Sequence, residues 1–131
     1  MFNGFTPAAG DFLWELAFNN ERVWFNEHKE QFEQTVNEPF KALAAETQAL
    51  MCSRFPEMDC RLHVSRIYRD ARRLFGRGPY KDHLWFSIKH GSILLEGPMF
   101  WFEIGAADYS YGMGFYWATP RQMEAFRRSL D

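Results

Sequence analysis

Apolar positions in the first half of the chain recur at steps of three and four residues, the period of a helix with one buried face. Thr6-Pro7 is a typical helix start, because threonine can cap free backbone N–H groups and proline is tolerated at the first helical position. The buried face of this first helix is expected to comprise Phe12, Leu13, Leu16 and Ala17. Asn19-Asn20 then ends the helix or caps the next one.

A second, longer helix is predicted to begin at Glu21. Its buried stripe comprises Phe25, His28, Phe32, Val36, Phe40, Leu43, Thr47 and Leu50. Pro39 interrupts the pattern, because it lacks a backbone donor and disfavours helical geometry at Glu38. We therefore expect a kink or a cap near Asn37, and the helix should end by Phe55-Pro56.

The second half of the chain changes to a period of two, which is typical of strands with one buried face. Leu84, Phe86 and Ile88 alternate with Trp85, Ser87 and Lys89, and Phe100, Phe102 and Ile104 alternate with Trp101 and Glu103. Further strands are predicted over residues 63–68, 93–96 and 109–118, with a turn at 90–92 and a break at 97–98. These strands predict a sheet that follows the helices.

The end of the chain predicts a short helix, because Thr119 and Gln122 form a capping box around Pro120. The expected fold class is α+β: N-terminal helices, one of them long and kinked near Pro39, packed on an antiparallel sheet, with a short C-terminal helix. No repeat, low-complexity run or linker interrupts the 131 residues. A single domain over residues 1–131 is therefore expected.

Composition excludes a disordered chain, since 47% of the residues are hydrophobic and 18% are aromatic. The N-terminus lacks the features of a signal peptide, and no apolar run approaches the length of a membrane span. We expect a cytoplasmic protein with no membrane partner. Its two cysteines, Cys52 and Cys60, are expected to be free thiols.

Charge is distributed unevenly along the chain, although the net charge is only −2. Residues 61–81 carry seven Lys or Arg against the single Asp70, a balance of +6, whereas residues 1–60 carry a balance of −6. The small net charge excludes a global field that would attract nucleic acid. An acidic half beside a basic segment predicts either internal ion pairs or an anion-binding site.

The basic segment contains the candidate site. Several arginines in one loop suit phosphate or carboxylate, because the guanidinium is planar and always charged. The candidate ligand-binding residues are Arg66, Arg69, Arg72, Tyr80 and Lys81. The candidates for moving a proton are Asp70, Tyr80 and His83, of which histidine is best suited to neutral pH. Structural pairing of Arg66 and Arg69 with Asp70 and with carboxylates of the long helix is an equally weighted alternative.

Other residues with chemical potential have simpler interpretations. His28 lies on the apolar stripe and is expected to be a core or hydrogen-bonded histidine rather than a catalytic one. Glu103 is expected to be exposed, and its functional alternative is a carboxylate that faces the arginines. The four histidines lack metal-ligand spacing, and no phosphate-binding, dinucleotide-binding or nucleophile-elbow motif is present. No metal and no cofactor are therefore predicted.

A family resemblance rests on the same segment. Arg66, Arg69, Asp70 and Arg72 form an Arg-x-x-Arg-Asp-x-Arg run, which Tyr80 follows. Further matches are Phe12-Leu13, Leu16, Asn19-Asn20, Arg22, Trp24-Phe25, His28-Lys29 and Pro39. With these motifs the chain resembles the bacterial and fungal family known as domain of unknown function 2461. The resemblance implies an α+β fold but no activity, and it implies a chain that is short at the C-terminus.

Three functions remain open from the sequence. The first is a module that binds an anionic small molecule or nucleic acid through Arg66, Arg69, Arg72, Tyr80 and Lys81. The second is an enzyme that acts on a small phosphorylated or carboxylated substrate. The third is an internal ionic clasp in an oligomer that needs no ligand.

Overall fold

The computed structural model of the chain describes residues 1–90, 98–115 and 118–130. Its N-terminal part is helical, with α1 (Pro7–Phe18), α2 (Arg22–Glu27), α3 (Lys29–Phe32), the π-helical turn η1 (Glu33–Asn37) and α4 (Glu38–Arg54). The remainder comprises β1 (Cys60–Val64), the 3₁₀ turn η2 (Ala71–Arg73), β2 (His83–His90), β3 (Met99–Gly105), β4 (Tyr109–Gly114) and α5 (Pro120–Ser129). The α+β architecture expected from the sequence is confirmed.

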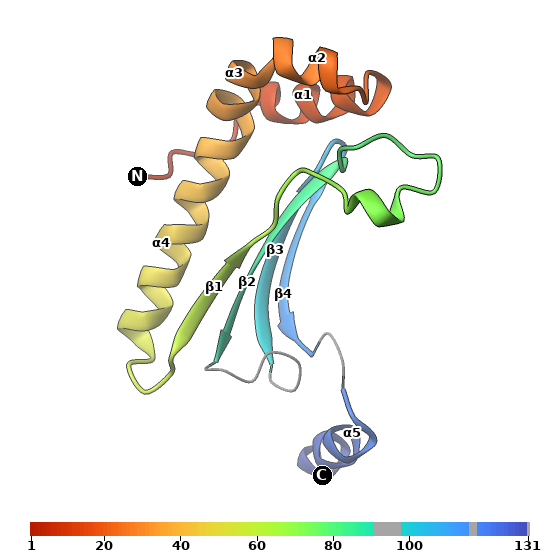
Figure 1. Ribbon diagram of the computed structural model, residues 1–131. Helices are drawn as coiled ribbons and strands as arrows, with labels where there is room; N and C mark the ends of the chain where they lie inside the picture. Colours follow the sequence, from red (N-terminus) through yellow and green to blue (C-terminus); the bar gives the residue numbers. More distant parts are fainter. Residues whose placement is uncertain (91–97, 116–117, 131) are drawn as a thin grey trace.

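The four described strands form an antiparallel sheet in the order β1-β2-β3-β4, so each strand pairs with its neighbour in sequence. Helix α4 runs along one face of this sheet beside β1, and α1 to α3 lie across one end, at the top of Figure 1. Phe40 of α4 meets Phe86 of β2 with 5.5 Å between ring centroids. No described helix covers the opposite face of the sheet, which we call the open face.

The first helix begins at Pro7 as predicted, with Thr6 at the N-cap position. The Thr6 side chain makes no capping hydrogen bond, so the start is set by proline and not by a threonine cap. Phe12, Leu13 and Leu16 are buried, whereas Ala17 is exposed and was wrongly assigned to the buried face.

The long second helix is interrupted twice. At His28 the backbone leaves helical geometry, with φ −112° and ψ 11°, and this break between α2 and α3 was not predicted. The second interruption is η1, which ends at Asn37 beside Pro39, so the expected kink takes the form of a π-helical turn. Helix α4 ends at Arg54, as predicted.

The π-helical turn also explains why part of the predicted stripe is wrong. Such a turn adds one residue to the helical repeat and so changes the register of the residues beyond it, although Phe40 of the predicted stripe remains buried. Beyond η1 the buried residues of α4 are Phe40 and Ala44. Leu50, which the uninterrupted period placed on the buried face, is 57% exposed.

Strands β2 and β3 follow the predicted alternation. Leu84, Phe86, Ile88 and Ile104 point toward the helices and are buried. The strand predicted over residues 63–68 is displaced: β1 starts at Cys60 and ends at Val64, where the pairing with Phe86 stops. The strand expected over residues 93–96 lies outside the described residues, and β4 is described from Tyr109 to Gly114.

The predicted capping box is present at the start of α5. Thr119 accepts a hydrogen bond from the backbone of Gln122, and the Gln122 side chain accepts one from Thr119 N–H. Helix α5 projects beyond the lower end of the sheet in Figure 1, and none of its residues is buried. Among the helices that the structure describes, none has the length and apolar character needed to cross a membrane.

Candidate functional site

The arginine-rich segment folds as a loop whose two ends lie side by side. Tyr68 and Tyr80 form an isolated antiparallel bridge. Arg69 N–H donates to the Pro79 carbonyl at 2.8 Å, and Lys81 N–H donates to the Ile67 carbonyl at 2.7 Å. This pairing brings the arginines that follow β1 next to the residues that precede β2.

Asn20, at the junction of α1 and α2, holds this loop against the helices. Its amide donates to the Tyr80 carbonyl at 2.8 Å, and its side-chain oxygen accepts from Tyr80 N–H at 2.9 Å. A Cβ at Gly78 would lie only 2.3 Å from Asn20 Cγ. Gly78 is therefore needed where the loop passes the Asn20 side chain.

The cations Arg66, Arg69 and Lys81 are among the residues that line a hollow of about 540 Å³ at this loop. We call it the basic hollow, and its other lining residues are His63, Val64, Ser65, Tyr68, Asp70, Arg72 and Trp85. Burial lowers the pKa of Lys81, and the charges of Arg66 and Arg69 lower it further. The three positive charges therefore act on one another across the hollow.

Asp70 does not balance these three charges closely, because it is bound by Arg72. Asp70 accepts hydrogen bonds from Arg72 N–H at 3.0 Å, from Nε at 3.0 Å and from Nη2 at 2.9 Å. These bonds lower the pKa of Asp70. In the described residues no carboxylate lies within ion-pair distance of Arg66, Arg69 or Lys81.

Tyr80 lies apart from the basic hollow. Its ring is 2% exposed and stacks on Phe25 with 4.3 Å between centroids. Burial raises the pKa of Tyr80, and so does the neighbouring Tyr68. Tyr80 lines a smaller hollow of about 250 Å³, which it shares with Arg22 and Arg69. Arg69 borders both hollows, since it also lines the basic one.

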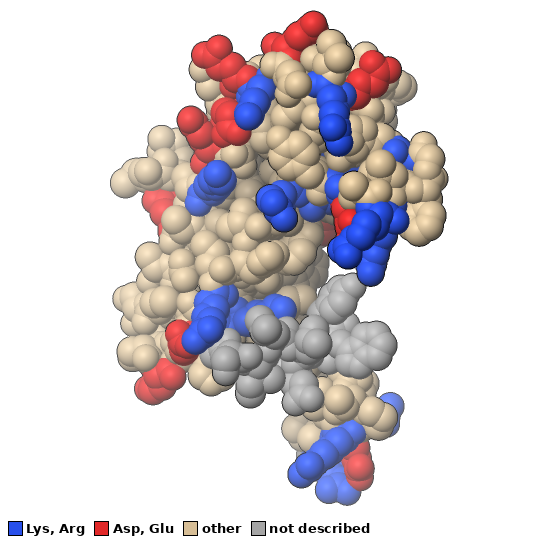
Figure 2. All heavy atoms as spheres, in the orientation of Figure 1, with Lys and Arg blue, Asp and Glu red and all other residues tan. Residues whose placement is uncertain are grey.

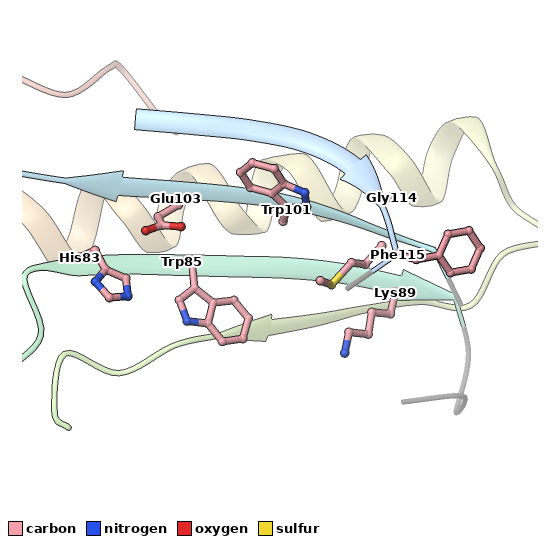
Figure 3. A pocket seen from close by; sticks show the side chains of 8 residues that line it. His83, Trp85, Lys89, Trp101, Glu103, Gly114 and Phe115 are labelled. Atoms are coloured by element: carbon pink, nitrogen blue, oxygen red, sulfur yellow. The ribbon is translucent and has the colours of Figure 1, made fainter. Parts of the chain in front are cut away.

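His83 lies in a third cavity, a groove of about 720 Å³ on the open face, which we call the tryptophan groove (Figure 3). The groove is lined by His83, Trp85, Lys89, Met99, Trp101, Glu103, Gly114 and Phe115. His83 Nδ1 and Asp82 Oδ1 are 2.8 Å apart, and this hydrogen bond lowers the pKa of Asp82. Glu103 belongs to this groove and does not line the basic hollow.

The structure thus divides the predicted site residues among three cavities. Arg66, Arg69, Asp70, Arg72 and Lys81 share the basic hollow, whereas Tyr80 and His83 each line a different cavity. Figure 2 shows Lys and Arg side chains gathered around the loop that carries η2.

The site residues predicted from the sequence do not include Trp85. Trp85 lines both the basic hollow and the tryptophan groove, and therefore joins them. The signal was present, because alternation with Leu84 and Phe86 places Trp85 on the face turned away from the core.

The remaining candidates have structural roles. His28 donates from Nδ1 to the Trp24 carbonyl at 2.7 Å and stacks on the Trp24 ring at 4.1 Å, as expected for a hydrogen-bonded histidine. Within the part of the chain that the structure describes, no three His, Cys, Asp or Glu side chains come together as a metal site.

Comparison with known proteins gives a family but no relative of known function. No curated protein and no solved structure matches the chain. The family model described as "Conserved hypothetical protein (DUF2461)" matches residues 8–131, which is nearly the whole chain. The chain therefore belongs to the DUF2461 family.

Proposed function

We propose that this protein binds an anionic ligand, carrying phosphate or carboxylate, in the basic hollow. The observation that carries the proposal is the convergence of Arg66, Arg69 and Lys81 on one hollow in which the lining carboxylate, Asp70, is already bound by Arg72. Burial and the charges of Arg66 and Arg69 lower the pKa of Lys81, and a bound anion would offset the repulsion among these charges. Arginine forks beside an ammonium are well suited to phosphate or carboxylate oxygens.

The ionic-clasp alternative requires ion pairs between the arginine-rich segment and the acidic helices. The ion pairs found among the described residues are instead local: Arg61 with Asp59, Arg72 with Asp70, His83 with Asp82 and Arg128 with Glu124. Each joins residues at most four positions apart. This pattern supports a ligand, and not a helix carboxylate, as the partner of Arg66 and Arg69.

Arg66→Gln is the variant that tests the proposal most cleanly, because the Arg66 side chain is exposed and makes no hydrogen bond within the described structure. The matched control is Arg73→Gln, which removes the same charge from the same loop but from a residue that does not line the hollow. Both variants and the wild type would be screened by thermal unfolding against pyrophosphate, phosphorylated sugars and di- and tricarboxylates.

A ligand at about 100 times its dissociation constant should raise the free energy of unfolding by about 2.7 kcal/mol. We expect this shift in wild type and in Arg73→Gln, and we expect Arg66→Gln to lose most of it. Equal shifts in Arg66→Gln and wild type would contradict the proposal. No shift with any anion, together with a large drop in Tm for Arg69→Gln, would favour the clasp.

A second candidate function, an enzyme, is favoured by one observation. His83, which is hydrogen-bonded to Asp82, lines the tryptophan groove, and Trp85 lines both this groove and the basic hollow. A histidine oriented by a carboxylate is a general acid or base in many enzymes. The other two candidates are less suited to accept a proton: the pKa of Asp70 is lowered and that of Tyr80 is raised. Turnover that His83→Gln abolishes, with anion affinity unchanged, would support an enzyme.

A further inference from the structure

We infer that the anionic ligand is a nucleoside phosphate, with its phosphate in the basic hollow and its base in the tryptophan groove. The inference rests on the proposed anion binding and adds a second subsite to it. Trp85 is its starting point, since this residue lines both cavities. A ligand that fills both must pass over the Trp85 indole.

Ser65 fixes Trp85 at the boundary of the two cavities. Ser65 N–H donates to the Trp85 carbonyl at 2.8 Å, and Trp85 N–H donates to Ser65 Oγ at 2.9 Å. Arg66, the next residue, lines the basic hollow together with Trp85. His63 contacts the Trp85 ring with 5.1 Å between centroids. The position of the indole relative to the cations is therefore set by the backbone and by a neighbouring ring.

The groove contains two indole rings on which a nucleobase could stack. Trp85 and Trp101 project from the adjacent strands β2 and β3 to the same side of the sheet (Figure 3). Trp101 lies flat against β4, where a Cβ at Gly112 would be only 3.1 Å from Trp101 Cζ2. Stacking on exposed indoles is the usual way in which proteins bind bases without reading their sequence.

The groove also offers a hydrogen-bond acceptor. Glu103 pairs with Trp85 in the strand register, and its carboxylate points into the groove near His83 (Figure 3). A carboxylate repels phosphate but accepts hydrogen bonds from amino groups and sugar hydroxyls. The basic hollow therefore supplies cations and the groove adds an acceptor, Glu103, beside its own cation, Lys89; this combination matches a nucleoside phosphate better than an apolar acid. The groove, at about 720 Å³, also has the usual size of a small-molecule site.

The test compares four probes by calorimetry at fixed ionic strength: pyrophosphate, ribose 5-phosphate, adenosine 5′-monophosphate and adenosine. We expect the nucleotide to bind at least about tenfold more tightly than ribose 5-phosphate, which has the phosphate and sugar but no base. Trp101→Leu should remove this advantage and leave pyrophosphate binding unchanged. Trp14→Leu is the matched control, because Trp14 is 56% exposed on α1, away from the groove.

A milder variant tests whether Trp101→Leu acts only by destabilising the fold. Trp101→Phe keeps an aromatic ring and should keep most of the nucleotide advantage, while its melting curve reports whether the sheet is intact. A single-stranded oligonucleotide with a 5′-phosphate distinguishes the two sources of the ligand. Tighter binding of the oligonucleotide than of the nucleotide would identify a strand end, and weaker or equal binding would identify a free nucleotide.

The two proposals fail in different ways. If pyrophosphate binds but the nucleotide binds no more tightly than ribose 5-phosphate, the nucleoside inference is wrong and anion binding stands. If no phosphate compound binds at all, both fail. If Trp14→Leu loses as much affinity as Trp101→Leu, the base does not lie in the tryptophan groove and the inference is again overturned.

Discussion

Lys81 shows at the scale of one residue how the proposed anion site can oppose stability. Its ammonium is partly buried and lies near Arg66 and Arg69, and all three effects lower its pKa. In the folded chain the charged form is therefore penalised relative to the unfolded chain. The presence of a lysine that lowers the stability of the fold is better explained by a role in ligand binding than by a role in the fold itself.

Lys81→Met should therefore raise Tm, by roughly 1–3 °C, while it weakens anion binding. The pH dependence follows from the sign of the shift. Between the lowered pKa of Lys81 and its ordinary value of 10.5 the unfolded chain binds more protons, so the stability of the wild type rises with pH in that window. The variant should lack this rise, which melting curves at several pH values would reveal.

Lys41→Met is the control for this experiment, because Lys41 is exposed on α4. Its Tm should change little, and its affinity for pyrophosphate should equal that of the wild type. A lower Tm in Lys81→Met than in Lys41→Met would mean that Lys81 has an ionic partner in the fold, and would argue against an unneutralised hollow.

The ends of helices and strands depend on contacts between distant residues, which the local hydrophobic pattern of the sequence does not contain. The helical period correctly placed Phe25, Phe32 and Phe40 in the core. It could not reveal the break at His28, where the imidazole binds the Trp24 carbonyl that the helix also uses. It also could not fix the end of β1, since that end depends on where β2 stops pairing with it.

The same reason explains what could be predicted of the site. The composition of residues 61–81 identified the cations, because a concentration of charge is visible in the sequence itself. The separation of Tyr80 from Lys81 was not visible. It arises from the pairing of Tyr68 with Tyr80 and from stacking on Phe25, both of which join distant parts of the chain.

The loop that carries the basic hollow should depend on Asn20. Asn20→Ala removes both hydrogen bonds to the Tyr80 backbone and should lower the free energy of unfolding by about 1–3 kcal/mol. It should also weaken pyrophosphate binding, because Arg69 and Lys81 lie on the loop that it releases. Asn19→Ala, which removes one exposed bond to the Glu15 carbonyl, should cost less and leave binding unchanged.

A double-mutant cycle makes this prediction sharper. Gly78→Ala alone should be strongly destabilising, since its Cβ would lie 2.3 Å from Asn20 Cγ. In the Asn20→Gly background, which also removes the Asn20 Cβ that would lie 2.6 Å away, that obstacle is gone, so the same substitution should cost much less. If the two changes add without coupling in denaturant unfolding, the Asn20 side chain does not occupy the space beside Gly78.

At the scale of the whole molecule, the sheet is covered unequally. Its helix-facing side contains the core, whereas the open face holds the tryptophan groove and the rim of the basic hollow. Helix α5 adds no buried residue to either side, and Met123, Phe126 and Leu130 are exposed on or beside it. The helices before β1 and the sheet therefore carry the fold.

Removal of residues 119–131 should consequently change Tm by less than about 2 °C and leave pyrophosphate affinity unchanged, because the deleted helix buries nothing against the rest. Leu13→Ala on α1 is the contrasting variant. Leu13 is fully buried, so its truncation should lower the free energy of unfolding by about 2–5 kcal/mol. Scanning calorimetry of both proteins compares an unburied helix with a buried side chain.

A drop in Tm for the deletion as large as that of Leu13→Ala would show that α5 packs on the sheet in solution. The tryptophan groove would then be the surface to examine for that contact, since it is a cavity on the open face.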